Sequence, residues 1–579
     1  MTNEKHRSAA QWSLRAVVFC AVMFFSNYNL NWYSPHLRPY SLGLIGLVGT
    51  LALAVAICRW ELWQRICTRL EGLLGELHPG ATVLLFVWGT LAALGLAYFI
   101  LDPIPHIPDG YAYVFQAKIF TLGKFYADTP ALPDFFPAPW SVNLDGRTFS
   151  VFPPGWPIVL SLGVALGQPW LVNPVLAGLC LFAMWHLWRE LFDVRRANFA
   201  LLLCAVSPFF LFMSAGFMSH NASLLASTVF VLGFLKSVRK QSIGWGVVAA
   251  CAIAFHILVR PVSAAFVWGP TVLFFALFQR SRASWIATAL SIVGSGFGSA
   301  LYGIYNRILT GEWGVPPLYF LAPANRYGFG ADIGLPWASS FPTPGHDLFR
   351  AAQNLNFNMT VMNSDLFGWP LASLSFVLVC LLFGRLAWQH KFCAAVVAAF
   401  VVSYAGYWYN GVAFGARFYY CLLPYLAILT VEGIRTTPRL LLELVPRMDE
   451  RSARTLVTTV VLGFVFYGAT IYIPKVGLTG PYWNQRKISY ELYEELHKQV
   501  QPGDLVLVEA DSDERYNPLF IHNEIDIETS DVVFAWDQGD QNNQRLLAHF
   551  EGRRVVRWRY PIERLKEETP MARLRGPAH

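Results

Sequence analysis

Residues 102–111 read Asp102-Pro-Ile-Pro-His106-Ile-Pro108-Asp109-Gly-Tyr111 and interrupt a chain that consists largely of long apolar runs. They open a polar loop that extends to Pro154 and carries carboxylates, prolines and aromatic residues. Both flanks are nearly uncharged and long enough to cross a bilayer repeatedly. A carboxylate at the edge of such an apolar mass is partly desolvated and can accept a proton from a hydroxyl group. We therefore take Asp109 as the candidate catalytic residue.

The composition is that of a membrane protein. The chain has 579 residues, of which 55% are hydrophobic and 14% charged, whereas about 25% of the residues of a soluble domain are charged. The net charge of +7 comes from Lys and Arg in short clusters between apolar runs. This distribution is typical of the positive-inside bias and not of a protein that binds nucleic acid. The cysteines indicate no disulfide framework, and no metal-ligand spacing appears, so no cofactor is indicated, although a divalent metal is possible.

The apolar runs predict an all-α polytopic protein with about 13 transmembrane helices, a cytoplasmic N-terminus and an extracytoplasmic C-terminus. Basic clusters fall on alternate connections throughout. Residues 155–167 are too short for a span, and a span there would place Arg189 and Arg195 on the outer face, so we expect a re-entrant or interfacial piece. The predicted spans are residues 16–32, 41–58, 81–101, 171–188, 199–214, 218–235, 243–259, 262–278, 285–305, 367–383, 392–409, 418–431 and 456–473.

Four parts follow from this pattern. We expect a three-span segment at residues 1–102, the first outer loop at 103–154, a multi-span core at 155–474 with an outer loop at 306–366, and a small extracytoplasmic domain at 475–579. In the last part, Ile488, Leu492, Leu496 and Val500 have helical spacing. Residues 505–508, 532–536 and 555–558 are short β-branched or aromatic runs that predict strands, so this domain is expected to be α/β.

A helix is predicted just after Asp109. Apolar residues at positions 111, 114, 115, 119 and 122 lie on one face of a helix, which favours an amphipathic helix along the membrane surface. Asp109 stands at the start of this helix, directly after Pro108. It could be the helix N-cap, a position where Asp is favoured, or a general base, and the two roles are compatible.

Three further residues lie at the predicted outer ends of spans, namely Arg260, Arg417 and His220. An arginine at membrane depth is costly unless it is paired with an anion. Each arginine could extend to the interface or pair with a loop carboxylate, or it could hold a lipid phosphate, which suits the guanidinium fork. His220 could be a buried polar residue with ordinary partners or a supporting residue of a site.

Several motifs together resemble those of the GT-C membrane glycosyltransferases. Asp109-Gly-Tyr111 resembles the acidic motif in the first outer loop of that superfamily. Phe152-Pro-Pro-Gly-Trp-Pro157 is similar to a motif of the protein mannosyltransferase and aminoarabinose transferase branch. Arg260-Pro261 and Arg417-Phe-Tyr-Tyr-Cys-Leu-Leu-Pro424 resemble motifs at the outer ends of later spans. The resemblance covers roughly residues 102–431.

The resemblance implies an inverting transfer of a sugar from a polyprenyl-phosphate donor to a hydroxyl or amine of a glycan, lipid or protein acceptor. The reaction would occur on the extracytoplasmic side of a bacterial inner (plasma) membrane. Asp109 would be the general base, Arg417 would hold the phosphate, and Arg260 would line the same cavity. The supporting candidates are His220, Tyr111, His106 and Tyr419. Many relatives have Asp-Glu where this chain has Asp109-Gly110, and the tail resembles no known acceptor domain.

Other functions are compatible with parts of this pattern. A transporter or flippase of lipid-linked glycans would use the same arginines without a base, but no matching halves with broken spans are evident. A polysaccharide polymerase or ligase would be expected to keep its functional residues in the late loop. A non-catalytic scaffold that presents the tail is a further alternative. Loss of transfer with retained lipid binding after substitution of Asp109 would favour the enzyme.

Overall fold

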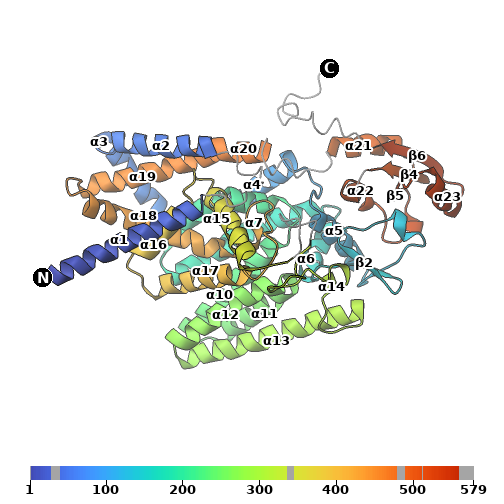
Figure 1. Cartoon of the computed structure of the whole chain (residues 1–579), viewed down its shortest axis with the longest axis horizontal. Helices are drawn as coiled ribbons and strands as arrows, with labels where there is room; N and C mark the ends of the chain where they lie inside the picture. Colours follow the sequence, from blue (N-terminus) through green and yellow to red (C-terminus); the bar gives the residue numbers. More distant parts are fainter. Residues whose placement is uncertain (1, 28–39, 336–344, 479–489, 511–512, 560–579) are drawn as a thin grey trace, which may run out of the picture.

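Long helices run side by side along the longest axis of the molecule, and a small domain built from the C-terminal residues lies at one end (Figure 1). The computed structural model describes residues 2–27, 40–335, 345–478, 490–510 and 513–559. The end of the first predicted span, residues 28–32, and Ile488 of the predicted tail helix lie outside the described residues.

The helices of the bundle coincide in most places with the apolar runs of the sequence. They are α1 (Thr2–Phe25), α2 (Tyr40–Ile57), α3 (Glu61–Gly75), α4 (Pro79–Phe99), α7 (Val172–Leu191), α8 (Val194–Ala205), α9 (Pro208–Ala215), α10 (His220–Lys240), α11 (Ile243–Val259), α12 (Pro261–Phe278), α13 (Arg282–Thr310), α15 (Leu348–Asp365), α16 (Ser375–Phe383), α17 (Trp388–Tyr404), α18 (Leu423–Leu444), α19 (Glu450–Tyr467) and α20 (Ile473–Leu478).

Within the described residues, six helices are long and apolar enough to cross a membrane, or up to eight if each of two bent pairs counts as one span. The bent pairs are α2 with α3, at 112°, and α8 with α9, at 58°. The chain is therefore an integral membrane protein, and the count of about 13 spans stays a prediction.

Two predicted spans are broken. Residues 199–214 form α8 and α9, because Pro208 begins α9 and the Ser207 hydroxyl caps that helix by accepting from the Phe210 amide. Residues 367–383 form a helix only from Ser375 onward, and turns that contain Pro370 precede it. In both places a proline that cannot continue the preceding helix interrupts the apolar run.

The predicted outer loop 306–366 contains an unexpected helix, α15. Its sequence is rich in asparagine and gives no apolar stripe, yet several of these amides are buried. The Asn354 side chain donates to the Trp408 carbonyl at 2.7 Å, and the Asn363 side-chain oxygen Oδ1 accepts from the Leu374 backbone amide at 2.9 Å. These hydrogen bonds to irregular backbone add to the apolar burial of Phe357, Val361 and Met362, and hydrophobic periodicity alone does not reveal such a helix.

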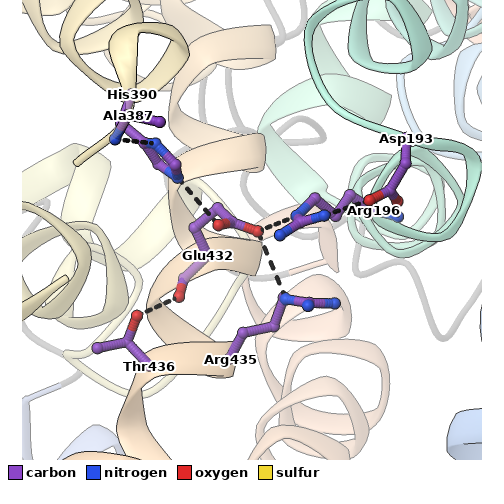
Figure 2. A network of polar contacts seen from close by, with 7 residues as sticks. All are labelled: Asp193, Arg196, Ala387, His390, Glu432, Arg435 and Thr436. Atoms are coloured by element: carbon purple, nitrogen blue, oxygen red, sulfur yellow. Dashed lines mark hydrogen bonds and ion pairs between the residues drawn. The ribbon is translucent and has the colours of Figure 1, made fainter. Parts of the chain in front are cut away.

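A buried polar network joins three helices of the bundle (Figure 2). The Glu432 carboxylate of α18 accepts from Arg196 of α8 and, at 2.9 Å, from His390 Nε2 of α17. His390 Nδ1 accepts from the Ala387 amide at 3.1 Å, so the ring proton resides on Nε2 and points at the carboxylate. Arg435 lies 3.6 Å from the same carboxylate. The single acidic group thus connects α8, α17 and α18.

A groove of about 940 Å³ lies between α3 and the first turn of α19 and is lined by Arg65, Arg69, Arg451 and Arg454. The 29-residue span that begins with α19 ends at Leu478. Near that end, Gly477 packs against Ile100, just before the loop that carries Asp109. The groove and Asp109 therefore lie at opposite ends of the bundle (Figure 1).

The first loop folds into a helix and a small sheet that lead into a short apolar helix. Its elements are α5 (Pro108–Thr121), β1 (Ala127–Asp128), η2 (Pro133–Phe135), β2 (Ser141–Leu144), β3 (Arg147–Ser150) and α6 (Gly155–Ala165), while α14 (Leu318–Leu321) belongs to the second loop. The three strands are antiparallel in the order β1-β3-β2. Asp145 and Gly146 both have positive φ in the turn between β2 and β3, as an Asp-Gly hairpin requires.

The C-terminal domain contains α21 (Tyr490–Gln499), β4 (Asp504–Glu509), α22 (Asp513–Phe520), η7 (Ile527–Thr529), β5 (Val533–Trp536), α23 (Asp540–His549) and β6 (Arg554–Arg559). Its sheet is parallel in the order β5-β4-β6. Residues 505–508 of the central strand are fully buried, as the continuous apolar run in β4 indicates.

Helix α5 is buried on two faces, so the expected amphipathic surface helix is wrong. Tyr111, Phe115 and Ile119 pack into the core of the C-terminal domain. Tyr113 and Ala117, on the other face, pack against α6 and α10. Of the predicted apolar face, positions 111, 115 and 119 meet one partner, whereas Val114 packs with the other cluster and Leu122 is exposed. Helical spacing alone did not show that two different partners cover the helix.

Candidate active site

Asp109 lies in the first turn of α5, where a negative charge interacts favourably with the helix dipole. Its Oδ1 accepts from Arg417 Nη1 at 3.4 Å, with 17% of the Asp109 side chain and 8% of the Arg417 side chain exposed. The N-cap of α5 is Ile107 and not Asp109, so the capping interpretation of Asp109 is wrong. Its carboxylate faces a cation from another part of the chain.

Arg417 begins η4 (Arg417–Leu422), the short 3₁₀ helix that leads into α18. The turn before it depends on Gly415, whose φ of +98° disfavours a side chain and whose carbonyl accepts from the Arg417 amide at 2.9 Å. Apart from its contact with Asp109, the guanidinium has a buried Nε without a hydrogen-bond partner among the described residues. The guanidinium therefore has a donor left for a ligand.

Arg260 forms the junction between α11 and α12, and Pro261 starts α12. Its Nη1 donates to the Ser219 hydroxyl at 3.2 Å, and that hydroxyl lies 3.3 Å from the Tyr113 hydroxyl, one turn after Asp109 on α5. The Arg260 and Arg417 guanidinium carbons lie 5.6 and 5.4 Å from the centre of the same ring, Phe418. Two cations held around one aromatic ring, with a single carboxylate nearby, favour an anionic ligand.

His220 is 2% exposed, and neither of its ring nitrogens has a hydrogen-bond partner among the described residues. It is the first residue of α10 and directly follows Ser219. A buried polar group without a partner costs about 1–3 kcal/mol, and such groups in native proteins call for an explanation. The expectation that His220 has ordinary partners is not met, and a ligand at this site would supply one.

The Phe152–Trp156 motif holds two of these segments in place. A Cβ at Gly155 would come within 2.8 Å of the Leu258 carbonyl, so only glycine lets α6 approach the backbone just before Arg260. The Trp156 indole donates to the Phe217 carbonyl at 2.9 Å, two residues before Ser219. The motif thus positions the junction that carries Arg260 and the turn that carries Ser219.

The structure does not bring the other three candidates, His106, Tyr111 and Tyr419, to the Asp109–Arg417 pair. His106 Nε2 contacts the Leu101 carbonyl within its own loop. Tyr111 is buried in the core shared with the C-terminal domain. The Tyr419 ring packs 5.5 Å from Tyr404, inside the bundle.

Gly110 accounts for the single carboxylate at this position. A Cβ there would lie 3.1 Å from Pro105 and 3.3 Å from Phe217. A side chain at this position would require Pro105 and Phe217 to shift by a few tenths of an ångström, so the local packing favours glycine here.

Sequence reasoning missed three residues of the site: Ser219, Tyr113 and Phe418. Each was detectable in hindsight from a short-range signal. Tyr113 follows Asp109 by one helical turn, and the other two are the direct neighbours of His220 and Arg417. Their importance comes from the long-range contacts described above.

Comparisons with known proteins agree with this architecture. Residues 153–302 match the family model described as dolichyl-phosphate-mannose-protein mannosyltransferase. No curated protein matches the chain significantly. The structure of ArnT from Cupriavidus metallidurans in the apo state superposes with a TM-score of 0.50 at 13% identity, covering 84% of this chain and 94% of that one.

Two further structures are similar at 13% identity. ArnT from Cupriavidus metallidurans bound to undecaprenyl phosphate gives a TM-score of 0.48 and covers 83% of this chain and 90% of its own. The oligosaccharyltransferase of Archaeoglobus fulgidus gives 0.41, with 79% and 64% covered. The family model and the fold shared with apo ArnT confirm the resemblance that the motifs predicted.

Proposed function

We propose, from the resemblance of this chain to the GT-C membrane glycosyltransferases of the mannosyltransferase and ArnT branch, that it transfers a sugar from a polyprenyl-phosphate donor. The acceptor would be a hydroxyl or amine, and the reaction would take place on the extracytoplasmic side. One observation carries the proposal: the Asp109 carboxylate lies 3.4 Å from Arg417, and Arg260 and the unpartnered His220 belong to the same cluster.

The two arginines suit a departing phosphate. When the bond between the anomeric carbon and the phosphate oxygen breaks, both bonding electrons leave with the phosphate, whose negative charge rises. Preorganised guanidinium groups stabilise a charge that develops in the transition state. Arg417 has a buried donor without a partner among the described residues, and Arg260 donates to the neutral hydroxyl of Ser219. Both can therefore turn toward phosphate oxygens.

Asp109 suits the acceptor side of the reaction. The acceptor oxygen or nitrogen attacks the anomeric carbon from the face opposite the phosphate and passes its proton to the Asp109 carboxylate, so the configuration inverts. One carboxylate is sufficient, because the donor carries its own leaving group and needs no acid to protonate a sugar oxygen. The Asp109 carboxylate contacts Arg417 until a phosphate competes for the guanidinium.

His220 completes the polar lining. Because its imidazole is buried next to Ser219, the hydrogen-bond acceptor of Arg260, and makes no hydrogen bond in the described protein, a donor hydroxyl or phosphate oxygen is the partner that fits. This contact would orient the sugar ring relative to Asp109, and such positioning makes a large contribution to group transfer.

The test is a transfer assay with the full chain in proteoliposomes. A panel of polyprenyl-phosphate sugars, labelled in the sugar, is supplied together with glycan, lipid and protein acceptors. The proposal predicts label on an acceptor, with inverted configuration, and release of polyprenyl phosphate. Movement of the intact labelled lipid between leaflets without transfer would support a flippase instead, and label added only to a growing polysaccharide would support a polymerase.

A further inference from the structure

Besides its apolar contacts, the C-terminal domain meets the helix that carries Asp109 at a half-buried cation, Lys118. Lys118, near the end of α5, donates from Nζ to the Ile521 carbonyl at 2.6 Å and to the Asn523 carbonyl at 3.1 Å. Both carbonyls lie just after the last residue of α22, Phe520. The end of a helix presents carbonyl groups without intrahelical partners and attracts positive charge. Lys118 thus supplies the end of α22 with a cation from a distant segment of the chain.

The acceptor side of this contact is rigid. The Asn523 side-chain Nδ2 donates to the Phe534 carbonyl at 2.9 Å, and its Oδ1 accepts from the Phe534 backbone amide at 2.8 Å, so the turn is fixed to β5. The Phe115 ring packs 5.5 Å from the Phe520 ring beside the Lys118 contact. Polar and apolar contacts together attach α5 to the sheet of the domain.

The opposite side of α5 is attached to the first loop. Gln116 accepts from the Ser150 amide at 2.9 Å and donates to the Phe125 carbonyl at 2.9 Å. The helix is therefore held from two directions, once by β3 and once by the C-terminal domain. Asp109 lies nine residues before Lys118, about 13 Å along a continuous helix. A tilt of α5 at Lys118 would be transmitted to the carboxylate.

We propose that the C-terminal domain is a clamp that positions Asp109 through α5, and that Lys118 is its positioning residue. The inference rests on the proposed function. The Asp109–Arg417 distance of 3.4 Å exceeds the 2.7–2.9 Å usual for a charged hydrogen bond, so a small shift of α5 decides whether the two groups engage. A misplacement of about 1 Å can reduce turnover by about 100-fold.

The experiment uses the full-length protein with Lys118→Met, which keeps the length of the side chain and removes its charge. Lys124→Met is the matched control, because Lys124 is 56% exposed and only approaches Asp128, at 3.8 Å. The expected result is a fall in kcat of about 10-fold or more with an unchanged KM for the donor, while the control behaves like the wild type. Lys118→Arg, which retains the donors, should restore most of the turnover, and Phe520→Leu should lower kcat from the domain side.

Hydrogen–deuterium exchange of the α5 amides, measured without substrate, gives a readout that does not depend on transfer. The clamp predicts faster exchange in Lys118→Met and none of this change in Lys124→Met. Unchanged exchange in Lys118→Met would overturn the clamp, and faster exchange with an unchanged kcat would overturn the positioning role. Faster exchange in a protein whose wild type transfers no sugar would support the clamp while the proposed function fails.

Discussion

Asp109 Oδ1 and Arg417 Nη1 lie 3.4 Å apart, although 308 positions separate the two residues in the chain. Asp109 lies in the first turn of α5, and Arg417 begins η4, the 3₁₀ helix that leads into α18. The contact is long for an ion pair of this kind. In the absence of a donor the two groups neutralise each other, and a phosphate would compete with Asp109 for the guanidinium. This exchange of partners underlies the first predictions below.

Asp109→Asn is expected to lower the turnover for transfer by about 100-fold or more, because the amide cannot accept the proton of the acceptor. Donor affinity should stay the same or rise, since the carboxylate no longer competes with phosphate for Arg417. Turnover is measured in the transfer assay and affinity by equilibrium binding of the labelled donor. Asp128→Asn, on an 87% exposed side chain, is the control. Wild-type turnover in Asp109→Asn would remove the general base.

Arg417→Gln is expected to weaken donor binding by about 10- to 100-fold, since hydrogen bonds to charged groups contribute about 1.5–3 kcal/mol each. The measurement is the dissociation constant of the polyprenyl-phosphate sugar, compared with that of polyprenol, which lacks the phosphate. Binding of polyprenol should not change. Arg282→Gln, at an exposed position at the start of α13, serves as the control. A donor affinity equal to that of the wild type would show that Arg417 does not hold the phosphate.

His220→Phe should reduce transfer by about 10-fold with little loss of stability, because the imidazole makes no hydrogen bond in the described protein that the change could break. His256 provides the contrast, since its Nε2 lies 2.8 Å from the Ser223 hydroxyl. His256→Phe should therefore cost about 1–3 kcal/mol of stability. Melting temperatures in detergent and transfer rates separate the two variants. If His220→Phe melts early and transfers normally, His220 has a structural role only.

Glu432→Gln should destabilise the bundle by about 1–3 kcal/mol, because Arg196 and His390 lose the charge of the acceptor that they share, while Arg196, with 25% of its side chain exposed, keeps its pair with Asp193 (Figure 2). Only 11% of the Glu432 side chain is exposed. Glu450→Gln removes a pair with Arg454 whose side chains are 66% and 61% exposed, and it should cost about 0–1 kcal/mol. The melting temperature in detergent tests both variants. Equal effects would mean that the network in Figure 2 contributes no more than a surface pair.

The C-terminal domain should lose stability in acid through Asp504. Hydrogen bonds from Arg554 at 2.6 and 2.8 Å hold the pKa of the Asp504 carboxyl below its ordinary value of about 4. The folded state therefore binds this proton more weakly than the unfolded state, so the stabilisation is complete above that ordinary value and is lost as the pH falls through the lowered pKa. Amide exchange of β4 between pH 6 and 3 measures the effect. Asp504→Asn should be less stable at pH 6 and show less change with pH.

The ends of the site helices were predictable from local chemistry. Pro108 and Pro261 start α5 and α12 at the positions where a proline fits a helix. Arg260 precedes Pro261 directly, so its place at the junction of α11 and α12 was predictable as well. The proximity of Asp109 and Arg417 was not available from periodicity, which describes one segment at a time. It was anticipated only through the order of the motifs. The placement of Tyr111 and Tyr419 away from the pair shows that adjacency in a motif does not ensure adjacency in the site.

What escaped prediction depends on contacts between distant segments. Asn354 of α15 donates to the Trp408 carbonyl, 54 residues away, and no local pattern encodes such a partner. No local pattern in the sequence distinguishes Lys118 from other surface lysines. Only the fold reveals that Lys118 meets the end of α22, where it donates to the carbonyl of Ile521, 403 residues later in the chain. The burial of α5 from both sides also depends on contacts between distant segments, which no local pattern encodes.

The most direct measurement is a cryo-electron microscopy structure of the full chain in a lipid nanodisc with bound polyprenyl phosphate. We expect density for the phosphate within hydrogen-bond distance of Arg417 and Arg260, close to His220, with the Asp109 carboxylate released from Arg417 and open to an acceptor. Phosphate density only in the arginine-lined groove between α3 and α19, at the far end of the bundle, with the Asp109–Arg417 pair unchanged, would contradict the account.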